Sequence, residues 1–78
     1  MGVKKVVIEY PIHDGQGLKP VHEFYDPQDA IAFLNNLPRH ALPKVRFYDG
    51  KFKGVNVGSP EDLARDVAKF FNDEDFRV

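Results

Sequence analysis

The sequence of 78 residues contains no cysteine. Without cysteine the chain forms no disulfide, offers no thiolate ligand to zinc or an iron–sulfur cluster, and has no cysteine nucleophile. A domain of this length buries roughly 60–65% of the surface that its unfolded chain exposes, so one hydrophobic core must supply its stability.

Long hydrophobic runs are also missing. No stretch approaches the roughly 20 apolar residues that a bilayer-spanning helix needs. The first residues, Met1–Ile8, lack the extended apolar segment of a signal peptide. We therefore expect a soluble, cytoplasmic protein that does not associate with membranes.

No sign of charge dominates, since 11 lysines and arginines stand against 12 aspartates and glutamates. This balance argues against attachment to nucleic acid by bulk phosphate attraction, although it permits a local basic patch. The hydrophobic share of 42% and the charged share of 29% are typical of a globular chain rather than a disordered one. We expect a single domain over residues 1–78.

The clearest local pattern is a hairpin in the second half of the chain. Two β-prone runs, 45–48 and 51–57, flank Asp49-Gly50, a dipeptide typical of tight hairpin turns. A two-residue turn there predicts that Phe47 lies opposite Phe52 and that Tyr48 lies opposite Lys51.

A helix start follows this hairpin directly. Ser59 is suited to cap a helix whose first residue is Pro60 and whose first turn is acidic. Asp26 and Pro27 provide the same signal after two earlier expected strands, Val3–Ile12 and Val21–Tyr25.

The two halves therefore echo each other as a ββα pseudo-repeat over 3–37 and 44–72, followed by an acidic tail over 73–78. A duplication and two independent uses of a favourable helix start both explain this echo. Each expected helix has one apolar stripe: Ala30, Ile31, Phe33, Leu34 and Leu37 in the first, and Leu63, Ala64, Val67, Phe70 and Phe71 in the second.

Each stripe must be buried against another element, which predicts the fold. The simplest arrangement is an α+β two-layer sandwich, in which a four-stranded, mainly antiparallel sheet carries both helices on one face, in ββαββα order. The opposite face of that sheet then has no cover.

Side chains of the central hairpin are the candidates for this uncovered face. We take Arg46, Tyr48, Lys51 and Lys53 as the candidate partner-binding residues, with an ordinary solvated strand face as the alternative reading. Val55 and Val57 alternate out of phase with Phe52. They lie outside as well, unless a β-bulge near Gly54 returns them to the core.

Residues 53–57 followed by Ser59-Pro60-Glu61-Asp62 resemble the third strand and second helix of an RNA-recognition motif, and residues 23–30 resemble the same piece. In that family, aromatic side chains of this strand stack on RNA bases. The corresponding positions here fall near Val55 and Val57, which cannot stack on bases. The resemblance is therefore limited to the junction between a strand and a capped helix.

Signals for chemistry are weak. The histidines, His13, His22 and His40, lack the spacing of metal ligands and a positioned catalytic partner. The glycine-containing loop 14–17 leads into a strand and not into the helix N-terminus that a phosphate loop requires. We expect no enzymatic activity, no cofactor and no metal site.

Two functional hypotheses follow. The first is a small non-catalytic accessory or inhibitor protein that docks on a larger protein through the exposed sheet face or an edge strand such as Val3–Ile12, an edge that would also permit a homodimer. The second is a nucleic-acid-binding module that uses the basic and aromatic hairpin 44–53, with Tyr48 as a stacking platform.

Overall fold

A computed structural model of the chain describes residues 3–10 and 21–72. In chain order its elements are β1 (Lys4–Glu9), β2 (Val21–Phe24), α1 (Pro27–Asn35), β3 (Lys44–Asp49), β4 (Phe52–Val57) and α2 (Pro60–Phe71). The expected ββαββα order and the α+β class are confirmed. The predicted acidic tail, the loop that carries His13 and the last two residues of the first predicted strand lie outside the described residues.

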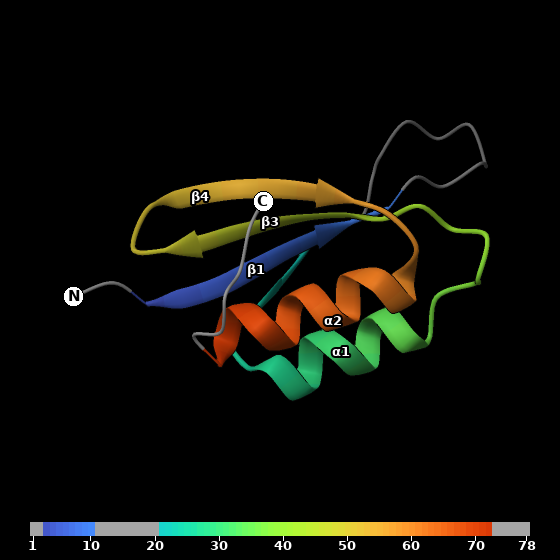
Figure 1. Ribbon diagram of the computed structural model, residues 1–78, viewed down its shortest axis with the longest axis horizontal. Coiled ribbons are helices and arrows are strands. Elements are labelled where there is room, and N and C mark those ends of the chain that lie inside the picture. The colour runs from blue at the N-terminus through green and yellow to red at the C-terminus, as the bar shows by residue number, and fades with distance from the viewer. Residues whose placement is uncertain (1–2, 11–20, 73–78) are drawn as a thin grey trace.

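The four strands form one antiparallel sheet in the order β2-β1-β3-β4. Both helices lie on the same face of this sheet (Figure 1). The prediction that the first strand forms an edge is wrong, because β1 pairs with β2 on one side and with β3 along its whole length on the other. The edges of the described sheet are β2 and β4.

The core lies between the two central strands and the two helices. Val6 and Ile8 of β1 and Val45 and Phe47 of β3 are completely buried, because alternate residues of a strand point to the same face. They pack against the helix residues Ala30, Leu34, Leu63, Val67 and Phe70. The rings of Phe47 and Phe70 meet edge to face with their centroids 5.2 Å apart.

Both predicted helix starts are confirmed. The Asp26 carboxylate accepts a hydrogen bond of 2.8 Å from the Gln28 backbone N–H, and the Ser59 hydroxyl accepts one of 3.3 Å from the Asp62 N–H. A proline follows each cap, at the start of the helix, where a backbone N–H has no carbonyl partner within the helix. Neither α1 nor α2 has the length and apolar character needed to cross a membrane.

The register of the second hairpin differs from the prediction. Tyr48 lies opposite Phe52 and Phe47 lies opposite Gly54, which leaves Lys53 as an extra residue in β4. This is a β-bulge, and Gly54 accommodates it with a φ of 153°, in a region that side chains disfavour. Gly50 supplies the positive φ of 78° that the turn requires.

The bulge has the opposite effect to the one considered from the sequence. It moves Phe52 to the uncovered face of the sheet and does not return Val55 and Val57 to the core. The helix-facing positions of β4 are occupied by Gly54, opposite buried Phe47, and by Asn56, opposite buried Val45.

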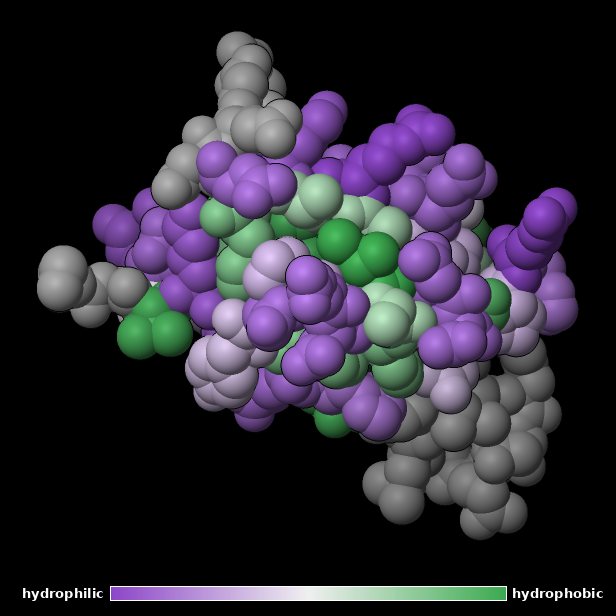
Figure 2. All heavy atoms as spheres, turned by 90° about the horizontal axis from the view of Figure 1, so that it is seen from below, coloured by the Kyte–Doolittle hydropathy of each residue, from purple (hydrophilic) through white to green (hydrophobic). Residues whose placement is uncertain are grey.

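The helix side of the molecule has a mixed surface. Figure 2 shows this side with a band of hydrophobic atoms bordered by hydrophilic ones. Each helix buries one stripe and exposes polar residues on its other side, as expected for amphipathic helices on a sheet.

Candidate functional site

The sheet face opposite the helices, here called the outer face, is the surface that the sequence analysis singled out. Among the described residues no element covers it (Figure 1). Because the inward residues of β1 and β3 are buried, the alternate residues Lys5, Glu9, Arg46 and Tyr48 point outward. Cross-strand pairing then fixes which outward side chains are neighbours.

Ion pairs link β2, β1 and β3 on the outer face, beside the apolar residues Val7 and Val21. The Lys5 ammonium lies 3.1 Å from the Glu23 carboxylate of β2. Arg46 donates from Nη1 to Glu9 Oε1 over 2.6 Å, and Lys44 Nζ lies 4.0 Å from the same carboxylate oxygen. Glu9 therefore neutralises cations from the strand that the sequence analysis treated as a basic cluster.

Tyr48 is held within this arrangement. The Lys5 Nζ lies 5.2 Å from the centroid of the Tyr48 ring, a cation–π distance, and the Phe52 ring meets Tyr48 edge to face at 5.5 Å. The hydrogen bond from Lys5 to Glu23 raises the pKa of the Lys5 ammonium.

The outer face of β4 is different because it is apolar. Phe52, Val55 and Val57 are 53%, 42% and 60% exposed, respectively, and they follow one another along the edge of the sheet. We call these three residues the apolar strip. They lie opposite outward residues of β3: Phe52 opposite Tyr48, Val55 opposite Arg46 and Val57 opposite Lys44.

The inner side of β4 is held by a polar contact. The Asn56 side-chain amide donates a hydrogen bond of 3.1 Å to the Asp66 carboxylate of α2. This contact fixes which side of β4 faces the helices, because reversing the strand would bury a valine against Asp66 and expose Asn56. The apolar strip faces outward because the register that turns Asn56 toward the helices turns Val55 and Val57 away from them.

The structure separates the four predicted site residues. Arg46 and Tyr48 are half-buried members of the paired region on β3. Lys51, in the turn, and Lys53, at the bulge, are exposed and form no ion pair with any residue that the structure describes. Two members of the outer face were not predicted from the sequence: Glu9, the anion that pairs with Arg46, and Phe52, which the expected turn placed opposite Phe47.

Comparison of the chain with known protein families, with curated proteins and with solved structures gives no match. The functional argument therefore rests on the chemistry of the surface itself.

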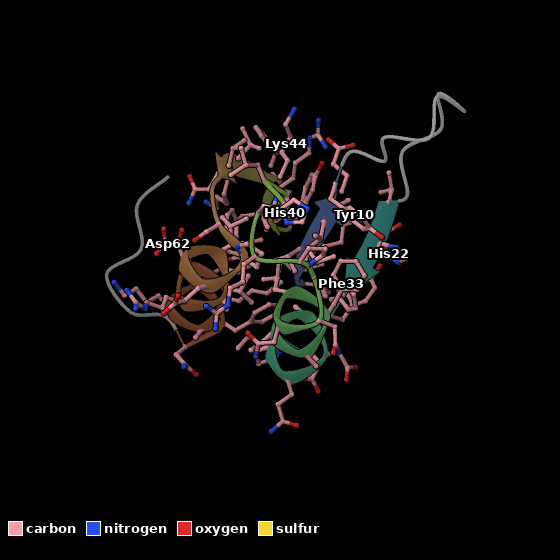
Figure 3. The ribbon with its side chains drawn as sticks, turned by 90° about the vertical axis from the view of Figure 1, so that its right-hand side faces the viewer. Tyr10, His22, Phe33, His40, Lys44 and Asp62 are labelled. Carbon is pink, nitrogen blue, oxygen red and sulfur yellow. The ribbon has the colours of Figure 1, made fainter. Side chains whose placement is uncertain are left out.

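A second aromatic group, which the sequence analysis also missed, lies at the opposite edge of the sheet. The Phe33 ring of α1 lies 6.0 Å from that of Tyr10, 4.6 Å from His22 and 5.4 Å from Phe24. Figure 3 shows Tyr10, His22 and Phe33 close together beside β2, whereas His40 lies in a separate loop. These rings fill the space between them, so we interpret the group as packing of β2 against α1.

A hollow of about 420 Å³ lies on the helix side, between the end of α1 and the start of α2. Buried Leu34 and Pro60 contribute to its wall, and Arg39 and Glu61 contribute charged groups. Glu61 is already paired with Arg65 at 3.4 Å. No group of three or more potential metal-ligating side chains occurs within residues 3–10 and 21–72.

Proposed function

We propose that this chain is a small non-catalytic accessory or inhibitor protein that docks on a larger protein through the β4 part of its outer face. The observation that carries the proposal is the apolar strip, in which Phe52, Val55 and Val57 are each at least 42% exposed on one edge strand. Single exposed apolar residues are ordinary, but a contiguous row is typical of an interaction surface.

The surroundings of the strip support docking because they form a polar rim. Arg46 and Lys44 lie opposite Val55 and Val57, and the Glu9 carboxylate holds both cations. An apolar centre bordered by polar groups is the usual organisation of a protein interface. Phe52 and Tyr48 add aromatic rings, which often contribute a large share of binding free energy.

The alternative, a nucleic-acid-binding module that uses residues 44–53, receives less support. Such a module needs cations that are available to phosphates and an aromatic face that is available to bases. Arg46 and Lys44 share an anion, and Lys5 lies over the Tyr48 ring. A base stacked on Tyr48 would have to displace Lys5.

The proposal is tested by quantitative affinity capture from cytosol of the source organism. The bait is the full chain, and the comparison bait carries Phe52→Ser with Val55→Thr. We expect a specific protein to be recovered at least about tenfold less by the double variant, because truncation of interface anchors costs on the order of 2 kcal/mol. Arg65→Ser with Lys69→Ser, which changes two exposed residues of α2, serves as the control and should leave recovery unchanged.

Equal recovery of every partner by the strip variant and by the unchanged chain would contradict the proposal. Oligonucleotide binding that weakens steeply with salt and survives the strip substitutions would favour the nucleic-acid alternative instead.

A further inference from the structure

The edge of β4 carries an open row of backbone groups as well as the apolar strip. Within residues 3–10 and 21–72, β4 pairs with β3 only, so its other edge has no neighbouring strand. The unpaired N–H and C=O groups of an edge strand can bind a further strand. Six residues give β4 a length of about 20 Å, enough to pair with a short extended peptide.

Two lysines lie at the start of this edge, and the one acidic residue of the hairpin 44–57 is Asp49, at the end of β3. Lys51 and Lys53 are exposed at the start of β4 and pair with no described residue. No residue of β4 is acidic. On the helix side of the strand, the Asp66 carboxylate of α2 accepts the Asn56 hydrogen bond.

These observations together limit the partner. From the edge, the apolar strip and the two lysines we infer that β4 binds an extended acidic segment of another protein, added to the sheet as a fifth strand. Apolar side chains of that segment would pack beside Phe52, Val55 and Val57, and its carboxylates would pair with Lys51 and Lys53. This inference rests on the proposed docking function and specifies the chemistry of the partner.

A second copy of the chain fits this edge less well. Two β4 strands paired antiparallel would place Lys53 of each copy near Val57 of the other, and β4 supplies no anion there. An acidic segment, in contrast, supplies carboxylates to pair with Lys51 and Lys53.

The test is selection of peptides of about ten residues from a random display library on the immobilised full chain, since that length spans β4. We expect selected sequences to alternate apolar with acidic residues. Lys51→Glu with Lys53→Glu should weaken these peptides at least about tenfold and should select basic peptides instead. Arg65→Glu with Lys69→Glu makes the same change in net charge on α2 and should leave both affinity and consensus unchanged.

Strand addition has its own signature, because alternate residues of an added strand direct their N–H groups toward the sheet. N-methylation of one alternate set of peptide residues should abolish binding, while methylation of the other set should leave binding within about twofold. Equal effects of the two sets would overturn strand addition.

The outcomes separate this inference from the proposed function. One outcome is that the selected peptides bind less well to the variant with Phe52→Ser and Val55→Thr but equally well to the variant with Lys51→Glu and Lys53→Glu. That result would overturn the acidic partner and leave the docking proposal intact. Peptides that bind both variants as well as the unchanged chain, or the absence of any enriched peptide, would overturn the acidic strand partner, whereas the affinity capture decides the docking proposal.

Two further measurements test for other occupants of the β4 edge. Concentration-dependent dimerisation of the full chain, removed by Val55→Lys, would make a second copy the occupant. A variant with Asp73→Asn, Glu74→Gln and Asp75→Asn that binds the peptides at least about tenfold more tightly would make the chain's own acidic residues the occupant. Either result would overturn the inference.

Discussion

The two edge strands of the sheet differ in where their aromatic side chains lie, although Val21 of β2, opposite Glu9, is 55% exposed. In β2, Phe24 and His22 face the helix layer and their rings pack around Phe33 of α1, while Glu23 faces outward in an ion pair with Lys5. In β4 the helix-facing positions hold a glycine and an asparagine, while the apolar strip faces outward.

The two edges therefore contribute differently to the stability of the fold and to the binding of a partner. At the β2 edge Tyr10, Phe24 and Phe33 are partly buried within the monomer, so they contribute to folding, whereas His22 is exposed. The strip on β4 stays largely in contact with water, and the free energy of burying it is available only to a partner. One edge therefore completes the fold, and the other is available for association.

The largest effect is expected from removing one aromatic ring at each edge. Phe33→Ala should lower the free energy of unfolding by about 2 kcal/mol, less than for a fully buried phenylalanine because Phe33 is only partly buried. Phe52→Ser should change it by less than about 0.5 kcal/mol. Urea denaturation of both variants measures the difference, and equal losses would contradict the division between the edges.

A smaller effect is expected from the contact that orients β4. Asn56→Ala should cost about 1 kcal/mol, because it leaves the partly buried Asp66 carboxylate without its hydrogen-bond donor. A double-mutant cycle with Asp66→Ala, followed by urea denaturation, isolates the pair. A coupling energy near zero would show that this hydrogen bond does not hold the strand in register.

The smallest effect concerns the ion pair at the β2 edge. The pKa of Lys5 is raised above its usual 10.5 by the hydrogen bond to Glu23, so Glu23→Gln should lower it toward that value. Because the folded-state pKa is the higher one, the pair stabilises the fold fully below pH 10.5, and this contribution is lost as the pH rises through the folded-state pKa. NMR titration of the Lys5 side chain in both proteins measures the shift; identical titration curves would exclude Glu23 as its cause.

Local signals in the sequence determined most of the architecture. Asp26 and Ser59, each followed by proline, defined the helix starts, and the apolar stripes placed both helices on one face of a sheet. These features depend on neighbouring residues and on the periodicity of helices and strands, which a single chain displays directly. The candidate face was also predictable, because Arg46 and Tyr48 alternate with buried Val45 and Phe47.

Tertiary structure alone decided the properties of that face. The bulge at Lys53 belongs to the pairing of β4 with β3, the same register directs Asn56 toward Asp66, and the bulge turns Phe52 outward. The pairing of Arg46 with Glu9 joins residues 37 positions apart, which strand order had to bring together. Because a shift of one residue in a strand reverses its faces, the sequence determined the layers of this protein, and only the strand register decided which side chains a partner can reach.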